Sequence, residues 1–191
     1  GTAALEAADV DPGRIDVVIA CAGIKHEGRS VLALEALRQT VQVNFLAAAV
    51  IVAWYVAGRA ARRPSRIALV SSMGRWHGMG STAGYTASKA ALSIWAESLE
   101  LELPRHDEGA ATITVVEPGL FESDMARPHP GRAFLFAPRR TVARRILDGA
   151  LAGKPVVRPP SWFALLTWTL CLAGRRTRAR VLSRAKSGAN P

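Results

Sequence analysis

Two side chains four residues apart, Tyr85 and Lys89, have the types and the spacing for proton-transfer chemistry. On a helix this step places the phenol and the ammonium on one face. A cation there stabilises the phenolate and so could lower the pKa of the tyrosine from about 10 toward the range of a working acid or base. Ser72, thirteen residues before Tyr85, can supply a second hydrogen-bond donor. The spacing alone is a weak pattern, and chance is the alternative.

The elements that must position these residues are predicted by runs of apolar residues. Residues 66–71 read as a buried strand, so Ser72 lies just past its carboxyl end. Residues 82–103 are helical up to a proline, which places Tyr85 and Lys89 in the first turns of a helix. Open parallel sheets bind their ligands at the carboxyl ends of the strands. We therefore expect a site at that edge.

Strand-like runs alternate with helical patterns along the chain, which is typical of βαβ units around a parallel sheet. The other predicted elements are strands at residues 15–20, 112–117 and 156–158, helices at 30–61 and 139–152, and an irregular loop at 121–138. A chain of 191 residues with 49% hydrophobic residues can bury one core. The fold class is therefore α/β.

The net charge of +10 is concentrated toward the C-terminus. Residues 127–191 hold 14 of the 25 Lys and Arg residues and a single acid, Asp148, whereas residues 1–126 carry 11 bases and 14 acids. Such a segment suggests an anionic partner, such as a membrane surface or an acidic substrate, and a solvated arginine-rich surface is an equal alternative. No nucleic-acid-binding motif accompanies the charge, so we expect no nucleic-acid partner.

An apolar stretch at residues 162–173 lies within this basic segment. It is too short to span a bilayer, which needs about 20 residues. We favour a helix that packs over a substrate cleft, which would suit a hydrophobic substrate. The alternative is a helix in the membrane interface, with Trp162 and Trp168 at headgroup depth. That contact would extend over residues 162–180, because four arginines follow the stretch: Arg175, Arg176, Arg178 and Arg180.

Cysteine and histidine spacing argues against a metal or disulfide framework. Cys21 and Cys171 lie far apart, which fits a reducing compartment, and no secretory signal opens the sequence, so we expect a cytoplasmic protein. The four histidines show no metal-ligand spacing, and we predict no metal site. They are His26, His77, His106 and His129.

Further motifs accompany the Ser72, Tyr85 and Lys89 set in a fixed order. They are Val18-Ile-Ala-Cys-Ala-Gly23, Asn44 within a helical pattern, and Pro118-Gly119-Leu-Phe-Glu-Ser123. Together they resemble the short-chain dehydrogenase/reductase family over essentially the whole chain. The first is similar to the family's Asn-Asn-Ala-Gly segment after its fourth strand, and the last to its Pro-Gly-x-x-x-Thr segment. Five matches in register make this resemblance strong.

The resemblance implies a Rossmann-like doubly wound parallel sheet and an NAD(P)-dependent oxidoreductase that interconverts a carbonyl and a secondary alcohol. Tyr85 would exchange a proton with the substrate oxygen, Lys89 would bind the nicotinamide ribose and lower the Tyr85 pKa, and Ser72 would hydrogen-bond the substrate carbonyl. Asn44 would hold a water that links Lys89 to solvent. NAD and NADP are not distinguished. The remaining implied cofactor contacts are Ala22, Gly23, Pro118, Gly119 and Ser123.

Three departures from the family pattern stand out. Cys21 replaces the second asparagine, and we expect a small buried thiol rather than a redox sensor. Ser123 replaces a threonine and keeps its hydroxyl. No Thr-Gly-x-x-x-Gly-x-Gly turn occurs in the 191 residues. We therefore expect a fragment that lacks the N-terminal cofactor-binding strands, that is inactive alone, and that exposes residues 15–20 as an apolar sheet edge.

These expectations define two segments and two functions. Residues 1–158 would form the partial Rossmann-like domain, and residues 159–191 an apolar and basic extension of it. The family also implies a homo-oligomer through helices 44–61 and 82–103, although burial within one chain explains their apolar content equally. The alternative function is that of a catalytically inactive or truncated member whose basic C-terminus binds a membrane surface or another anionic partner.

Overall fold

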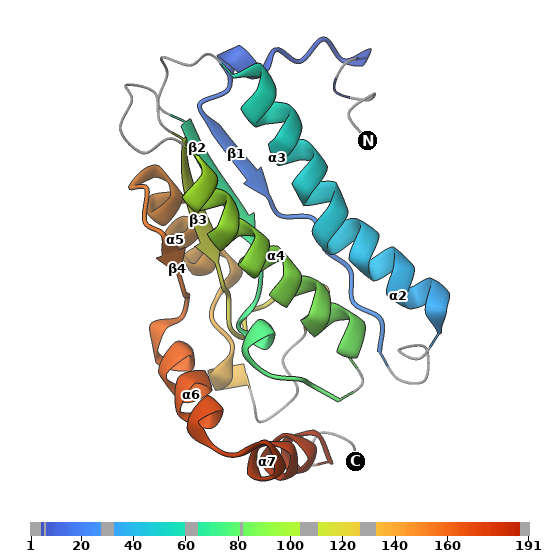
Figure 1. The fold of residues 1–191 in the computed structure, drawn as a ribbon. Helices are drawn as coiled ribbons and strands as arrows, with labels where there is room; N and C mark the ends of the chain where they lie inside the picture. Colours follow the sequence, from blue (N-terminus) through green and yellow to red (C-terminus); the bar gives the residue numbers. More distant parts are fainter. Residues whose placement is uncertain are drawn as a thin grey trace.

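The computed structural model describes residues 5, 7–27, 33–59, 65–80, 82–103, 111–126 and 133–187. Its centre is a parallel sheet of four strands in the order β1-β2-β3-β4. The strands are β1 (Val17–Ala20), β2 (Ser65–Val70), β3 (Ala111–Val116) and β4 (Val156–Val157). Because neighbouring strands run the same way, their carboxyl ends meet at one edge (Figure 1). The predicted α/β class is confirmed.

Helices cover both faces of this sheet, as in a Rossmann-like doubly wound fold (Figure 1). One face carries α3 (Ala47–Gly58) and α4 (Ala83–Glu102), and the other carries α5 (Arg139–Leu151). Helix α2 (Leu34–Val41) continues into α3 through a π-helical turn, η3 (Gln42–Leu46). Short 3-10 turns lie at η1 (Pro12–Arg14), η4 (Met73–Trp76) and η5 (Ala133–Leu135). Within the predicted 121–138 loop, residues 127–132 lie outside the described residues.

Side chains of the strands alternate between two apolar layers. Ile67 and Leu69 of β2 join the larger core with Tyr55 of α3. Ala68, between them, faces the other way and meets Ala150 of α5. Burial on both faces explains why the strands read as near-continuous apolar runs.

Strand β1 is an edge of the sheet. It pairs with β2 alone among the described strands, and Ile19 on it is 42% exposed. The prediction that residues 15–20 form an apolar sheet edge is confirmed, although the strand itself begins at Val17.

The continuous helix Leu34–Gly58 is, by length and composition, apolar enough to cross a membrane, with a mean hydropathy of 1.8 over its most apolar window. In this fold it lies along the sheet. Val52 and Tyr55 on it are fully buried in the core, and the Tyr55 hydroxyl donates to the Ile15 carbonyl at 2.9 Å. These contacts place one face of the helix in the core of the domain.

Two further helices, α6 (Ser161–Leu172) and α7 (Arg175–Ser187), lie beyond the carboxyl edge of the sheet (Figure 1). Helix α6 matches the predicted apolar stretch. Helix α7 was missed, because its arginines leave almost no apolar stripe for a periodicity argument to find.

Candidate active site

Ser72 and Tyr85 meet at the carboxyl edge of β2. Ser72 lies two residues past the end of the strand and caps η4, where its Oγ accepts from the Gly74 amide at 3.0 Å. Tyr85 lies in the first turn of α4, and its hydroxyl is hydrogen-bonded to the Ser72 side chain. The structure thus brings together the two hydroxyls that the sequence placed thirteen residues apart.

Burial raises the pKa of Tyr85 above its ordinary value of 10, and the hydrogen bond with Ser72 opposes this by favouring the phenolate. Lys89 makes no contribution to this shift, contrary to the expectation that it would lower the Tyr85 pKa. The reason is packing, because desolvation of the phenol outweighs the one hydrogen bond it receives. Tyr85 is therefore a neutral phenol at neutral pH, which is the form that donates a proton.

Lys89 is a buried cation one helical turn further along α4. It is only 3% exposed, and its Nζ donates to the Val70 carbonyl at the end of β2 at 2.7 Å. Burial lowers its pKa from 10.5 to about 8, and a smaller electrostatic interaction with Cys21 opposes this. A side chain added at Gly23 would lie 3.4 Å from the Lys89 Nζ, so the ammonium reaches the segment that follows β1.

Asn44 is fully buried in the π-helical turn and joins that segment to α4. Its Oδ1 accepts from the Ile24 amide at 2.7 Å, and its Nδ2 donates to the Ile24 carbonyl and to Ser88 Oγ, both at 3.0 Å. Ser88 in turn donates to the Tyr85 carbonyl at 2.8 Å. Such π turns are frequent at functional sites. Asn44 thus positions the helix that bears Tyr85, and its water-holding role stays a prediction.

Hydroxyls anchor α4 to the residue before Ser72. Ser71 Oγ donates to the Lys89 carbonyl at 2.8 Å, and Ser93 Oγ donates to Ser71 Oγ at 2.7 Å. All of these side chains except Lys89 are small, which allows the helix to approach the strand closely. The distance between the Ser72 turn and Lys89 is therefore fixed by the hydrogen bonds that Ser71 makes with the Lys89 carbonyl and with Ser93.

A buried carboxylate network, missed by the sequence analysis, supports the Ser72 turn. Glu117 directly follows β3 and has no exposed surface. It forms ion pairs with Arg75 and Arg158 and accepts from Trp76 Nε1 at 3.1 Å. The Arg158 pair measures 2.6 Å, and its guanidinium lies 4.9 Å from the centre of the Trp76 ring. Arg75 also pairs with Glu97 of α4 at 3.0 Å. The sequence feature that could have revealed this network is the single acid, Glu117, at the end of an apolar run. A carboxylate in such a place is buried and therefore needs charged or hydrogen-bonding partners.

The Pro118-Gly119 segment is joined to the same turn. The Pro118 carbonyl accepts from the Met73 amide at 3.0 Å, and the Gly119 amide donates to the Pro159 carbonyl at 2.9 Å. Ser123, by contrast, is used locally, because its Oγ accepts from the Ala126 amide at 3.1 Å within a turn.

Cys21 and Ala22 are exposed, and the expectation that Cys21 is a buried thiol is wrong. The cause is the position of these residues, because they follow the edge strand β1.

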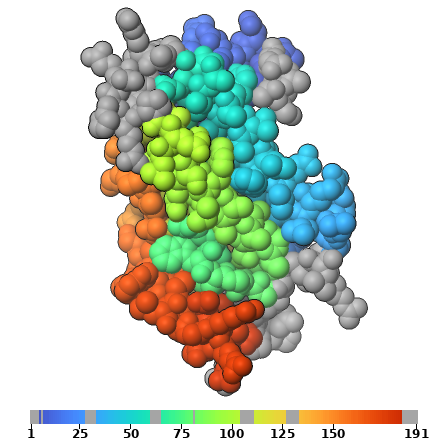
Figure 2. Space-filling view, in the orientation of Figure 1, coloured from blue at the N-terminus to red at the C-terminus, as the bar shows by residue number. Residues whose placement is uncertain are grey.

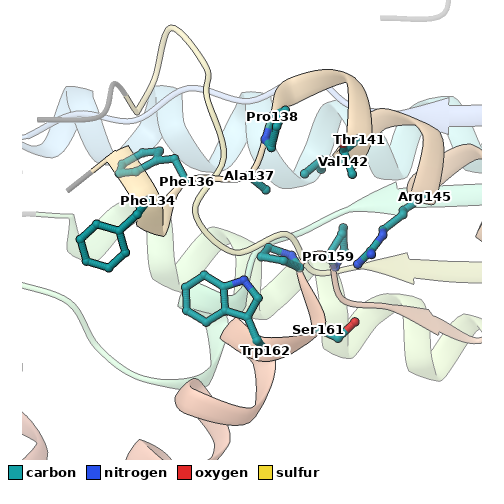
Figure 3. Close-up of a pocket in the computed structure, with 11 residues that line it drawn as sticks. Phe134, Phe136, Ala137, Pro138, Thr141, Val142, Arg145, Pro159, Ser161 and Trp162 are labelled. Atoms are coloured by element: carbon teal, nitrogen blue, oxygen red, sulfur yellow. The ribbon is translucent and has the colours of Figure 1, made fainter. Parts of the chain in front are cut away.

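A cavity of about 400 Å³ lies at the carboxyl end of β4, between η5 and the starts of α5 and α6 (Figure 3). Phe134, Phe136 and Trp162 supply aromatic walls, and Arg145 supplies a charge. Figure 3 shows the Trp162 ring and the two phenylalanines on one side and Arg145 on the other. The cavity lies at the sheet edge that carries the Ser72 set, but Ser72 and Tyr85 do not line it.

A parallel doubly wound sheet with a serine, a tyrosine and a lysine gathered at its carboxyl edge defines a dehydrogenase-type domain. The family model for short chain dehydrogenases matches residues 2–131, so the chain belongs to the short chain dehydrogenase family. The predicted family membership is confirmed.

Relatives and solved structures agree with this assignment. 11-beta-hydroxysteroid dehydrogenase A of Sesamum indicum is 29% identical over 174 residues, which are 82% of this chain and 49% of the relative. 11-beta-hydroxysteroid dehydrogenase-like 4A of Arabidopsis thaliana is 31% identical over 110 residues, which are 54% of this chain and 36% of the relative. The chain therefore spans about a third to a half of the curated relatives that it matches.

In structure, a short-chain dehydrogenase of Streptomyces avermitilis superposes with a TM-score of 0.66 at 20% identity, covering 97% of this chain and 76% of the other. An NADPH-dependent 3-quinuclidinone reductase of Rhodotorula rubra gives a TM-score of 0.65 at 19% identity, covering 82% and 64%. At this level of identity the two structures establish a common fold.

Proposed function

We propose that the protein is an NAD(P)-dependent oxidoreductase that interconverts a carbonyl and a secondary alcohol, with Tyr85 as the proton donor and acceptor. One observation carries the proposal: the Tyr85 hydroxyl is bonded to Ser72 at the carboxyl edge of the sheet, where burial keeps the phenol protonated. Membership of the short chain dehydrogenase family supports the same chemistry.

The residues at this edge fit a nicotinamide cofactor. Lys89 is a buried cation whose Nζ reaches toward Gly23, and such a group suits the hydroxyls of a ribose. The Pro118 carbonyl accepts from the Met73 amide of the Ser72 turn, which brings the Pro118-Gly119 segment to the same edge of the sheet. When bound, the cofactor supplies or takes the hydride.

The chain's own residues account for the proton. In the reducing direction, Ser72 donates a hydrogen bond to the substrate oxygen and Tyr85 passes it the phenolic proton. The hydrogen bond with Ser72 then favours the phenolate that remains. In the oxidising direction the phenolate recovers the proton. Asn44 keeps α4 in place throughout through its bond to Ser88.

A hydrophobic substrate suits the surroundings of the site. Aromatic side chains line the cavity at the end of β4, two strands from β2, and α6 covers the same edge of the sheet with an apolar helix. Two relatives are named as hydroxysteroid dehydrogenases, which supports a substrate of this class. We extend the proposal to hydrophobic ketones and the corresponding secondary alcohols.

The test compares two tyrosine variants of the full-length protein. Hydrophobic ketones, steroids among them, are offered with NADH and NADPH, and loss of cofactor absorbance is followed. Tyr85→Phe should lower the rate by about 10²-fold or more. Tyr55→Phe removes the other tyrosine hydroxyl, which donates to the Ile15 carbonyl near the amino end of β1, away from the carboxyl edge, and should keep the rate. A Tyr85→Phe variant within a few-fold of the wild type would remove the acid/base role.

A second candidate function is that of an inactive family member whose basic C-terminus binds a membrane surface or another anionic partner. The sequence favours the binding half of this idea, because residues 161–187 contain six bases and no acid. Absence of turnover with every ketone and both cofactors, in a full-length protein that binds anionic vesicles, would favour this function over the first.

We also propose that the full-length protein self-associates through α3 and α4. Val50 is 42% exposed on α3, and Ile94 and Leu101 on α4 are 57% and 73% exposed. Large apolar side chains in such positions are typical of subunit interfaces. A cytoplasmic location stays a prediction.

A further inference from the structure

Helix α6 has two apolar faces, and only one of them is explained by the fold. The inner face holds Phe163, Thr167 and Cys171, which are spaced at i, i+4 and i+8. Thr167 Oγ1 lies 3.9 Å from Met73 Sδ, Cys171 Sγ donates to the Trp76 carbonyl at 3.6 Å, and the Phe163 ring lies against Gly119. This face fixes α6 on the Ser72 turn.

The opposite face is equally apolar but has no partner among the described residues. Its large side chains are 47 to 69% exposed and, at 100° per residue, spread over about 160° of the helix. They are Trp162, Leu165, Leu166, Trp168 and Leu172. Phe134, which lines the same cavity as Trp162, is 79% exposed and adds to this surface. A surface of this kind marks a protein or membrane contact.

Helix α7 adds positive charge beside this apolar face. Arg175, Arg176 and Arg180 are exposed on it, and the whole of residues 161–187 contains no acid. Arg178 points inward, where its Nη1 donates to the Cys171 carbonyl at 3.3 Å, so α7 is tied to the end of α6. The two helices together form one end of the molecule, coloured orange to red in Figure 2.

We propose that the outer face of α6, with the exposed arginines of α7, docks on a bilayer that contains anionic lipid. The tryptophans and leucines of α6 suit the acyl boundary of a membrane surface. The arginines of α7, with no acid beside them, suit its negatively charged headgroups. A nucleic acid would need the charge but not the leucines. With 12 residues, α6 lies in the interface and does not cross it.

Docking can be tested separately from the proposed oxidoreductase activity, because Tyr85, Ser72 and Lys89 belong to other elements of the fold. Tyr85→Phe should therefore bind vesicles as the wild type does. Failure of turnover and failure of docking are separate results.

The experiment is sedimentation of the full-length protein with phosphatidylcholine vesicles, with and without 30% phosphatidylserine. We expect stronger binding with phosphatidylserine and a loss of this difference at high salt, because the arginine contribution is screened. Bromine-labelled acyl chains should quench the tryptophan fluorescence. Trp162→Phe/Trp168→Phe should remove most of that quenching, since the other three tryptophans lie in the body of the domain.

Matched variants on α5 provide the controls. Leu165→Gln/Leu166→Gln should weaken binding about tenfold or more, whereas Leu147→Gln/Leu151→Gln, also exposed, should not. Arg175→Gln/Arg176→Gln should weaken binding to the anionic vesicles about 25-fold, at about fivefold per charge, whereas Arg140→Gln/Arg144→Gln should not.

Three outcomes would overturn the proposal. The first is vesicle binding that is equally strong with and without phosphatidylserine, or that the α5 control variants weaken as much as the α6 and α7 variants do. The second is a change in molar mass by light scattering for Leu165→Gln/Leu166→Gln without vesicles, which would make this face an interface between copies of the chain. The third is binding to a DNA duplex that the arginine variant abolishes and the leucine variant leaves intact, with no binding to vesicles.

Discussion

The burial of Lys89 predicts that the stability of the protein rises with pH above 8. Its pKa falls from 10.5 in an exposed lysine to about 8 in the fold, because burial disfavours the ammonium. Between these two values the unfolded chain still carries the proton that the folded chain has lost. Because the unfolded state then binds more protons, the free energy of unfolding increases with pH over this range and levels off on either side.

The size of the effect follows from the same two values. At about 1.36 kcal/mol for each pH unit, a fall from 10.5 to about 8 corresponds to about 3 kcal/mol. Lys89 is 3% exposed, so solvent screens little of this. A Lys89→Met variant keeps most of the length of the side chain and has no group that titrates. Loss of the hydrogen bond to the Val70 carbonyl lowers the free energy of unfolding of the variant by about 1 kcal/mol at every pH. The test is therefore the slope of the free energy of unfolding against pH.

The measurement is urea unfolding of the cofactor-free, full-length protein at intervals from pH 7 to 10.5. The wild type should gain about 3 kcal/mol relative to Lys89→Met across this range, and most of the gain should fall above pH 8. Groups that do not interact with Lys89 cancel in the difference. Parallel curves, or a wild type that loses stability relative to the variant, would refute the argument that burial acts on the Lys89 ammonium.

Two further predictions concern the supports of the Ser72 turn, and both are measured by urea unfolding. Glu117→Gln leaves two arginines short of a counter-charge and should cost about 3 kcal/mol or more, whereas Glu97→Gln, in an exposed pair with Arg75, should cost less than about 1 kcal/mol. Equal losses would remove the claim that burial makes the difference. Gly119→Ala would place a methyl group 2.5 Å from the Phe163 ring and should cost about 1 to 3 kcal/mol, whereas Gly78→Ala meets nothing within 4 Å and should stay within about 0.5 kcal/mol. A Gly119→Ala variant with the same free energy of unfolding as the wild type would show that α6 is not packed against this glycine.

The sequence predicted those features that depend on local pattern. Strand β2 and helix α4 have clear apolar runs with definite ends, so Ser72 and Tyr85 could be placed at a strand end and a helix start. The edge position of β1 was also predicted, although through the family's strand order rather than through any property of residues 15–20.

The features that were missed depend on contacts between distant residues. Glu117 meets Trp76 and Arg158, each 41 positions away, and neither partner has a motif around it. The direction of the Tyr85 pKa was wrong for a related reason, because burial is a property of packing and the spacing to Lys89 reports only proximity along the helix. Helix α7 was missed because charge without an apolar stripe gives no period to read.

The supports of Ser72 converge from segments that are far apart in sequence. Its own turn is bonded to Pro118 through Met73, Glu117 pairs with Arg75 three residues further on, and α6 contacts the same turn through Thr167. Misplacement of a reacting group by about 1 Å can cost about 10²-fold in rate. The C-terminal helices are therefore part of what positions the candidate catalytic serine. The inner face of α6 contacts that serine's turn, and its outer face is the surface that we propose docks on lipid. Ordering of one face of α6 therefore also orders the other.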